Sequence, residues 1–235
     1  MENKSWKGWL YLLPAVLFLG IFMVYPLVDV LIYSLEEGFN FASQSYSGVG
    51  LYNYAYVLQD PYFLQALKNT FILVLITVPV STGLALLISV ALSSIQKLRE
   101  AFQTIFFLPY VTNSIAIGMV FEAMFNIVGF GTNNPSFGII NNVLGLFGVD
   151  PINWINAGSG YWANIAVLTI YIVWNALPFK ILILLGGLQS INKQYYDAAK
   201  VDSTPRVRVF TKITVPLLSP MLAYVVITGF IGCFK

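Results

Sequence analysis

Apolar runs long enough to cross a membrane constrain the fold of this chain more than any other feature. A transmembrane helix needs about 20 consecutive, mainly apolar residues to cross the hydrocarbon core of a bilayer. Because lipid offers the backbone no hydrogen-bonding partner, runs of this length must pair their own amide and carbonyl groups as helices. The sequence therefore predicts an all-α integral membrane protein with about five spans, near residues 9–35, 70–92, 102–125, 161–188 and 217–234.

The composition agrees with a membrane location and excludes several other classes. Hydrophobic residues make up 58% of the chain and charged residues only 9%, well outside the range of soluble domains. The formal net charge of +2 is too small to indicate a nucleic-acid partner. Without histidine, the chain has no histidine metal site and no histidine-based catalysis. The single cysteine, Cys233, lies in an apolar run, where we expect a small buried side chain.

The first apolar run has a signal peptide as its alternative interpretation. The hydrophobic region of a signal peptide spans about 7–15 residues and ends at a small-residue cleavage site. Residues 9–35 form a longer run that continues through Pro26 and Asp29. We therefore predict an uncleaved first helix.

The distribution of basic residues predicts which loops face the cytoplasm, since cytoplasmic loops carry an excess of lysine and arginine. Residues 127–160 contain neither, and residues 36–66 hold only acidic charges, so both segments are expected outside. Residues 36–66 should contain a short helix, and residues 127–160 include a short apolar segment at residues 139–146. With a cytoplasmic N-terminus, only Lys68 falls near an outer loop. The basic residues then assigned to the cytoplasm are Lys4, Lys7, Lys97, Arg99, Lys193, Lys200, Arg206, Arg208 and Lys212.

Residues 190–216 form a long polar segment between two spans, and their pattern predicts two short helices. Asn192 can cap the first helix. Ser203 or Thr204 can cap the second, with Pro205 at its first position, where the missing N–H costs nothing. Small residues in the first helix would let a partner approach the backbone closely, so we predict a docking surface. The stripe at i, i+3, i+4 and i+7 consists of Tyr195, Ala198, Ala199 and Asp202.

This segment is similar to the EAA loop of the membrane subunits of ATP-binding-cassette (ABC) importers. The family pattern reads EAA, then a DGA three residues on, then F and P. Asp197 stands in place of the glutamate, and Ser203 and Thr204 replace the glycine and alanine of the second triplet. The matching residues are Ala198, Ala199, Asp202, Phe210 and Pro216. The resemblance implies that ATPase subunits dock on this loop, at Tyr195, Tyr196, Asp197, Ala198, Ala199, Asp202, Ser203 and Thr204.

Two further segments resemble the carbohydrate-uptake members of this family. They are GLYNY at residues 50–54, followed by DPYF at 60–63 and NT at 69–70, and FGIINN at 137–142 with INW at 152–154. The resemblance covers nearly the whole chain and implies one permease domain over residues 1–235 with the type I ABC importer transmembrane fold. Because that family usually has six spans, the C-terminal span is expected to be missing from this sequence.

The resemblance implies a permease subunit of the bacterial cell membrane that translocates a sugar or oligosaccharide. It would work beside a second, different permease subunit and receive its solute from an extracellular solute-binding protein. The sequence has no P-loop, so ATP hydrolysis is expected in separate subunits, and we expect no catalysis, cofactor or metal in this chain. The alternatives are the same machinery carrying a polyamine, metal or phosphate ester, or a proton-coupled carrier that uses Asp29, Glu122 or Lys180.

Polar residues inside the predicted spans are candidates for the substrate path, because they are costly in lipid. Asn113, Trp174 and Asn175 are predicted to lie at one depth. An aromatic ring stacks on the C–H face of a sugar and amides bind its hydroxyl groups, so these residues suit a sugar path. The alternative is hydrogen bonding between helices for the asparagines and core packing for Trp174. Lys180 is expected to extend its amine toward the inner membrane boundary.

Overall fold

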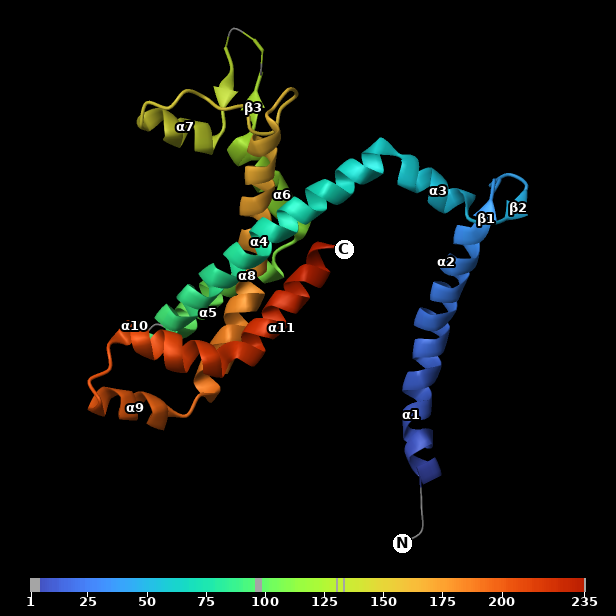
Figure 1. The fold of residues 1–235 in the computed structure, drawn as a ribbon. Coiled ribbons are helices and arrows are strands. Elements are labelled where there is room, and N and C mark those ends of the chain that lie inside the picture. The colour runs from blue at the N-terminus through green and yellow to red at the C-terminus, as the bar shows by residue number, and fades with distance from the viewer. Residues whose placement is uncertain (1–4, 96–98, 130, 133, 235) are drawn as a thin grey trace. The chain divides into compact units, whose positions relative to one another are not determined.

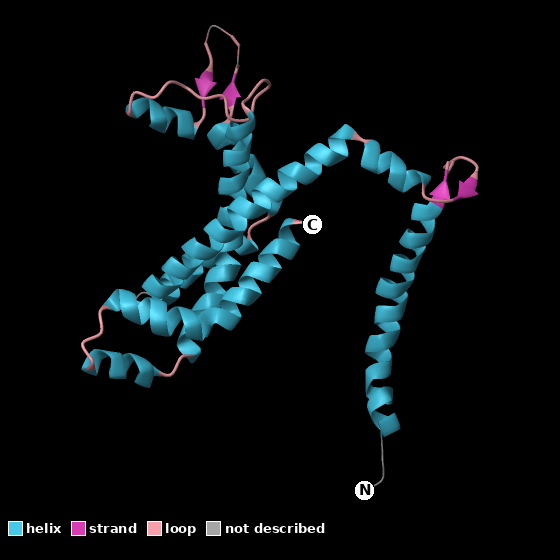
Figure 2. Ribbon diagram, viewed as in Figure 1, coloured by secondary structure: helices cyan, strands magenta, loops and turns pink. Residues whose placement is uncertain are grey.

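Helices make up most of the structure, a computed structural model that describes residues 5–95, 99–129, 131–132 and 134–234 (Figure 1; Figure 2). Lys4 and Lys97, expected in the cytoplasm, lie outside the described residues. The chain divides into two compact units, residues 1–68 and residues 69–235. Over the described residues, four helical segments are long and apolar enough to cross a membrane, or five if one bent helix pair counts as a span. This agrees with the predicted number of spans.

The first unit consists of a long helical segment, a hairpin and a short helix. The two strands of the hairpin are antiparallel, with Glu36 opposite Val49. The carboxylate of Glu37 accepts a hydrogen bond from the backbone N–H of Tyr52 at 2.9 Å and so fixes the start of the short helix. The elements are α1 (Ser5–Leu19), the π-helical turn η1 (Gly20–Val24), α2 (Tyr25–Leu35), β1 (Glu36–Glu37), β2 (Gly48–Val49) and α3 (Tyr52–Gln59).

The second unit contains the remaining elements, and the long helix α4 leads into it from the first. The prediction of a span at residues 161–188 is confirmed by α8, whereas the last helical segment begins inside the segment that we predicted as a loop. The elements are α4 (Pro61–Ser94), α5 (Arg99–Val111), α6 (Ser114–Phe125), β3 (Ile127–Val128), β4 (Ser136–Phe137), α7 (Ile139–Leu146), α8 (Tyr161–Ser190), α9 (Lys193–Val201), α10 (Arg206–Val209), the π-helical turn η2 (Phe210–Thr214) and α11 (Val215–Cys233).

Each of the two π-helical turns ends two residues before a proline, Pro26 after η1 and Pro216 after η2. In an α-helix, a proline ring clashes with the carbonyl group four residues earlier. A wider turn moves that carbonyl away from the ring. In both turns the N–H of the residue before the proline bonds to the carbonyl five residues earlier, as a π-helix requires. Both helical segments therefore continue through their prolines.

The core of the second unit lies where α8 packs between α4 and α11. Small residues allow the helices to approach closely there. Ser89 of α4 donates a hydrogen bond from its hydroxyl to the carbonyl of Ile181 at 3.2 Å. A Cβ atom added to Gly187 would lie 2.7 Å from the side chain of Leu218, so this crossing of α8 and α11 requires glycine. The buried apolar cluster consists of Ala85, Leu92, Ile181, Leu184, Leu185, Leu188, Leu218 and Val225.

The predicted third span is broken, contrary to the expectation of one continuous helix over residues 102–125. Helices α5 and α6 meet at an angle of 102°, with Thr112 and Asn113 between them. The Asn113 side chain accepts a hydrogen bond from the N–H of Ile115 at 2.9 Å and caps α6. An asparagine that satisfies the backbone in this way favours a new helix start over continuation of the old one.

The segment after α6 contains a buried amide, that of Asn141, which is 3% exposed. Asn141 lies in α7, whose bounds match the apolar segment identified from the sequence. Its carbonyl oxygen accepts hydrogen bonds from the N–H of Ile152 and from Nε1 of Trp154, at 3.1 and 3.0 Å. Its amide nitrogen donates to the carbonyl of Ile152 at 2.9 Å. One side chain therefore ties α7 to the chain that leads into α8.

The end of α9 is closed by a Schellman motif, in which the N–H of Thr204 bonds to the carbonyl of Ala199 and that of Ser203 to the carbonyl of Lys200. This motif needs a left-handed residue, and Ser203 has φ of +51°. The expectation that Ser203 or Thr204 caps the second helix is wrong. Pro205 occupies the cap position of α10, and no side chain caps that helix.

We expect Ser203→Gly to raise the free energy of unfolding by about 0.5–1 kcal/mol, because glycine adopts the left-handed conformation without the Cβ clash that serine has. The melting temperature of the purified protein in detergent measures this change. Ser219→Gly is the matched control, because Ser219 lies inside α11 and glycine there should destabilise. A fall in melting temperature for both variants would contradict the expectation.

We expect Asn141→Ala to lower the melting temperature, because it leaves the N–H groups of the half-buried Ile152 and Trp154 without their acceptor. Each such group costs about 1–3 kcal/mol. Asn142→Ala is the control, since Asn142 is exposed and donates one hydrogen bond, to the carbonyl of Phe137. Equal melting temperatures for the two variants would show that the buried network does not hold this segment.

Candidate functional site

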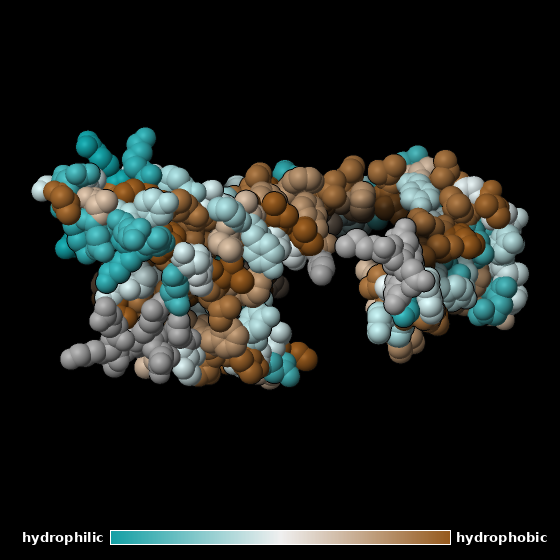
Figure 3. All heavy atoms as spheres, turned by 90° about the horizontal axis from the view of Figure 1, so that it is seen from below, coloured by the Kyte–Doolittle hydropathy of each residue, from teal (hydrophilic) through white to brown (hydrophobic). Residues whose placement is uncertain are grey.

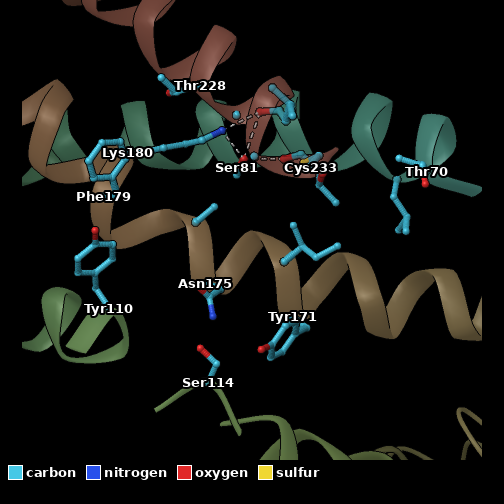
Figure 4. A pocket seen from close by; sticks show the side chains of 17 residues that line it. Thr70, Ser81, Tyr110, Ser114, Tyr171, Asn175, Phe179, Lys180, Thr228 and Cys233 are labelled. Atoms are coloured by element: carbon cyan, nitrogen blue, oxygen red, sulfur yellow. Dashed lines mark hydrogen bonds between the residues drawn. The ribbon is translucent and has the colours of Figure 1, made fainter. Parts of the chain in front are cut away.

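The second unit contains a cavity of about 1130 Å³ between the helices α4, α5, α6, α8 and α11 (Figure 4). Two neighbouring stripes of α8 line it at helical spacing. Tyr171, Asn175 and Phe179 form one stripe, and Ile172, Ala176 and Lys180 form the other. The cavity is large enough for a small oligosaccharide, since pockets for drug-sized ligands have volumes of about 300–1,000 Å³.

One wall of the cavity carries a buried lysine, which comes from α8 and meets α4. Lys180 is 4% exposed. Its Nζ donates hydrogen bonds to Oγ of Ser81 at 2.7 Å and to Oγ1 of Thr82 at 2.9 Å, and lies 3.5 Å from the carbonyl oxygen of Val78. The expectation that this amine extends toward the membrane boundary is wrong. The hydroxyl groups of α4 offer it a nearer set of acceptors inside the unit.

The other wall combines aromatic, amide and hydroxyl groups. Tyr110 of α5 stacks on Phe179 of α8, with ring centroids 6.3 Å apart and an angle of 19° between the rings. Asn175 points toward Ser114 at the start of α6 (Figure 4). Tyr171 lies one turn before Asn175 on the same face of α8. Such a wall can stack against the C–H face of a sugar ring and exchange hydrogen bonds with its hydroxyl groups.

The structure brings only one of the three predicted path residues to this cavity. Asn175 lines it, whereas Trp174 packs against Phe121, with ring centroids 5.7 Å apart, and lines a separate hollow of about 420 Å³. The Asn113 side chain is used as the cap of α6. Sequence reasoning did not select Tyr110, Tyr171, Ser81 or Thr82. Lys180 was named only for a proton-coupled carrier and not for the sugar path, although a lysine in a span is a functional candidate.

The EAA-like segment forms the second candidate site, with α9 as its centre. The predicted cap is confirmed, since Oδ1 of Asn192 accepts a hydrogen bond from the N–H of Gln194 at 3.0 Å. Ala199, a residue of α9, is buried. The hydroxyl of Tyr196 lies 3.3 Å from Oγ1 of Thr214 and so connects α9 to η2. This helix is therefore fixed to the helical segment that becomes α11.

The outer face of α9 presents both charged and apolar groups. Asp197 is exposed and forms a salt bridge with Lys200 at 3.2 Å, which at such exposure adds little stability and leaves the carboxylate accessible. The large apolar side chains exposed on α9 and α10 are Tyr195, Val201 and Val207. Figure 3 shows hydrophilic side chains gathered at the end of this unit where α9 and α10 lie.

Comparison with known proteins places these features in a family. Residues 81–235 match the family described as "Binding-protein-dependent transport system inner membrane component". The chain is 33% identical to the lactose transport system permease protein LacF of Rhizobium radiobacter, over 97% of this chain and 73% of that protein. It is 30% identical to the arabinooligosaccharides transport system permease protein AraP of Bacillus subtilis, over 99% of this chain and 70% of that protein.

A solved structure supports the fold. In the crystal structure of a bacterial alginate ABC transporter in complex with an alginate pentasaccharide-bound periplasmic protein, one chain matches with a TM-score of 0.78 at 20% identity, covering 97% of this chain and 72% of that one. The all-α type I importer fold expected from the sequence is thereby confirmed. From the family match and the similarity to sugar permeases, this chain belongs to the binding-protein-dependent transport system inner membrane components, the permease subunits of ABC importers.

Proposed function

We propose that this permease passes a sugar or oligosaccharide through the cavity of its second unit, driven by ATPase subunits that dock on α9. The observation that carries the proposal is the presence, in one compact unit, of a cavity with an aromatic and amide wall and of an exposed EAA-like helix. The names of the relatives, which are lactose and arabinooligosaccharide permeases, support the carbohydrate class.

The proposed assembly contains four kinds of chain in a bacterial cell membrane. A second permease subunit would complete the path, ATPase subunits would bind the coupling loop at residues 190–216, and an extracellular solute-binding protein would deliver the sugar. ATP hydrolysis belongs to the ATPase subunits, because this sequence has no P-loop. The N-terminus is proposed to be cytoplasmic, on the same side as the basic residues of the coupling loop.

The charge of the cavity argues against a cationic solute. A polyamine or a metal cation would meet the buried amine of Lys180, which repels it. Of the three residues named for a proton-coupled carrier, only Lys180 lines the cavity, and no carboxylate is among the described residues that line it. Glu122 is exposed on α6, and Asp29 belongs to the first unit. The amine would not repel a phosphate ester, and it is the aromatic and amide wall together with the names of the relatives that favours a sugar.

We expect Asp197→Lys to release the ATPase and abolish uptake, because it reverses a charge at the proposed docking surface. Truncating or reversing a charge in a buried interfacial pair costs about 2–5 kcal/mol, a loss of affinity of roughly 30-fold or more. Co-purification of the ATPase and sugar uptake measure the effect, and Asp197→Glu should preserve both. Lys200→Ala is the control, since it removes the salt bridge within α9 but keeps the carboxylate. An Asp197→Lys variant that retains the ATPase and full uptake would refute docking at α9.

We expect Asn175→Ala to raise the KM of sugar uptake about tenfold, since it removes an amide that can exchange hydrogen bonds with the solute. Trp174→Ala should instead lower protein stability, because the ring packs against Phe121. Leu168→Ala is the control at an exposed position of α8. Uptake kinetics that change for Trp174→Ala but not for Asn175→Ala would reverse the assignment of these two residues.

A further inference from the structure

The lysine in the cavity wall lacks a partner of opposite charge. Lys180 is the only charged side chain among the described residues that line the cavity. The one ion pair between described residues joins Asp197 and Lys200, so no described carboxylate pairs with Lys180. Hydroxyl and carbonyl groups solvate an ammonium group but do not neutralise it. A buried charge without a counterion is costly, and a bound anion would remove that cost.

The hydrogen bonds around Lys180 leave one direction open for such an anion. Two N–H groups of the amine reach Ser81 and Thr82 at 2.7 and 2.9 Å, while the third has only the distant carbonyl of Val78, at 3.5 Å. The Ser81 hydroxyl donates its own hydrogen to the carbonyl of Thr77 at 2.6 Å, so it meets the lysine as an acceptor. Ser81 therefore holds the amine in place, and the amine keeps a donor for a ligand in the cavity.

A glycine on α11 allows that helix to pass close to the amine. A Cβ atom added to Gly229 would lie 3.2 Å from Nζ of Lys180 and 3.4 Å from the side chain of Val78. Gly229 also lines the cavity. The backbone of α11 therefore lies close to the amine, and a larger residue at position 229 would crowd it, while its hydroxyl partners are both on α4.

We infer that Lys180 forms an anion subsite in the cavity and that the transported solute is a sugar that bears an acidic group, such as a uronate carboxylate. This inference rests on the proposed function. The acidic group accepts the free N–H of Lys180 in a charge-assisted hydrogen bond. The sugar ring lies between this wall and the wall of Tyr110, Tyr171 and Asn175, which binds its C–H face and its hydroxyl groups.

The test compares acidic and neutral sugars on the purified transporter, assembled from the full-length permease and its partner subunits. Binding of digalacturonate and of a glucuronate-containing disaccharide is measured by calorimetry beside their neutral counterparts. We expect at least one acidic sugar to bind about ten- to hundredfold more tightly than its neutral counterpart, with a preference that falls as salt rises. Lys180→Met should abolish the preference, and Lys180→Arg should retain part of it.

A second variant covers the case in which Lys180→Met does not assemble. Gly229→Ala retains the charge but crowds Nζ, so it should weaken binding of the acidic sugar more than binding of the neutral one. Equal binding of acidic and neutral sugars by the unmodified transporter, or absence of binding by either acidic sugar, overturns the inference. The inference is also overturned if the preference for the acidic sugar survives in Lys180→Met. If Lys180→Met fails to assemble, survival of that preference in Gly229→Ala overturns it.

The same experiments separate this inference from the proposed function. If neutral sugars bind and are taken up while acidic ones are not, the sugar permease stands and the anion subsite fails. If the transporter takes up no sugar of either class and Asp197→Lys keeps its ATPase, the proposed function itself fails.

Discussion

The close approach of α8 to α4 and α11 is the interaction on which the second unit depends. In lipid, apolar side chains gain little from leaving their surroundings, so helices associate through tight packing and hydrogen bonds between them. Ala85 and Ser89 on α4 and Gly187 on α8 make that packing possible, and the hydroxyl of Ser89 reaches the backbone of α8. The same three helices also line the cavity, so the helices that pack at the crossing form part of the cavity wall.

Much of the fold could be predicted from the sequence, because membrane helices follow from length and apolar composition alone. The bounds of α7 and most of α8 agree with the apolar runs, and the cap of α9 agrees with the position of Asn192. The break between α5 and α6 could not be predicted in this way. Asn113 lies within an apolar run, and only the structure shows that its side chain caps α6.

The candidate site was predicted less completely, for a reason that lies in helix geometry. Trp174 and Asn175 are adjacent, and neighbours on a helix point about 100° apart. The cavity faces the side of α8 that carries Asn175 and Ala176, so Trp174 lies outside it and lines a separate hollow. The residues that accompany Asn175 are those four positions away on either side, Tyr171 and Phe179. For Lys180, the side chain is long enough to reach either the membrane boundary or another helix. The choice depended on Ser81 and Thr82, which lie about 100 residues earlier in the chain.

The π-helical turn before Pro216 has a consequence for how α9 is connected to the cavity. A π-helical turn holds one more residue than an α-helical turn, while the helix on either side keeps its direction of winding. The extra residue in η2 therefore rotates the side chains of α11 about the helix axis relative to those of α10. This rotation changes which side chains of α11 face α8. Thr228, Gly229 and Gly232 reach the cavity wall in this phase. Counting positions from α10 with a single 3.6-residue repeat would place other residues there, so the wider turn before Pro216 affects the composition of a wall more than two turns further along the chain.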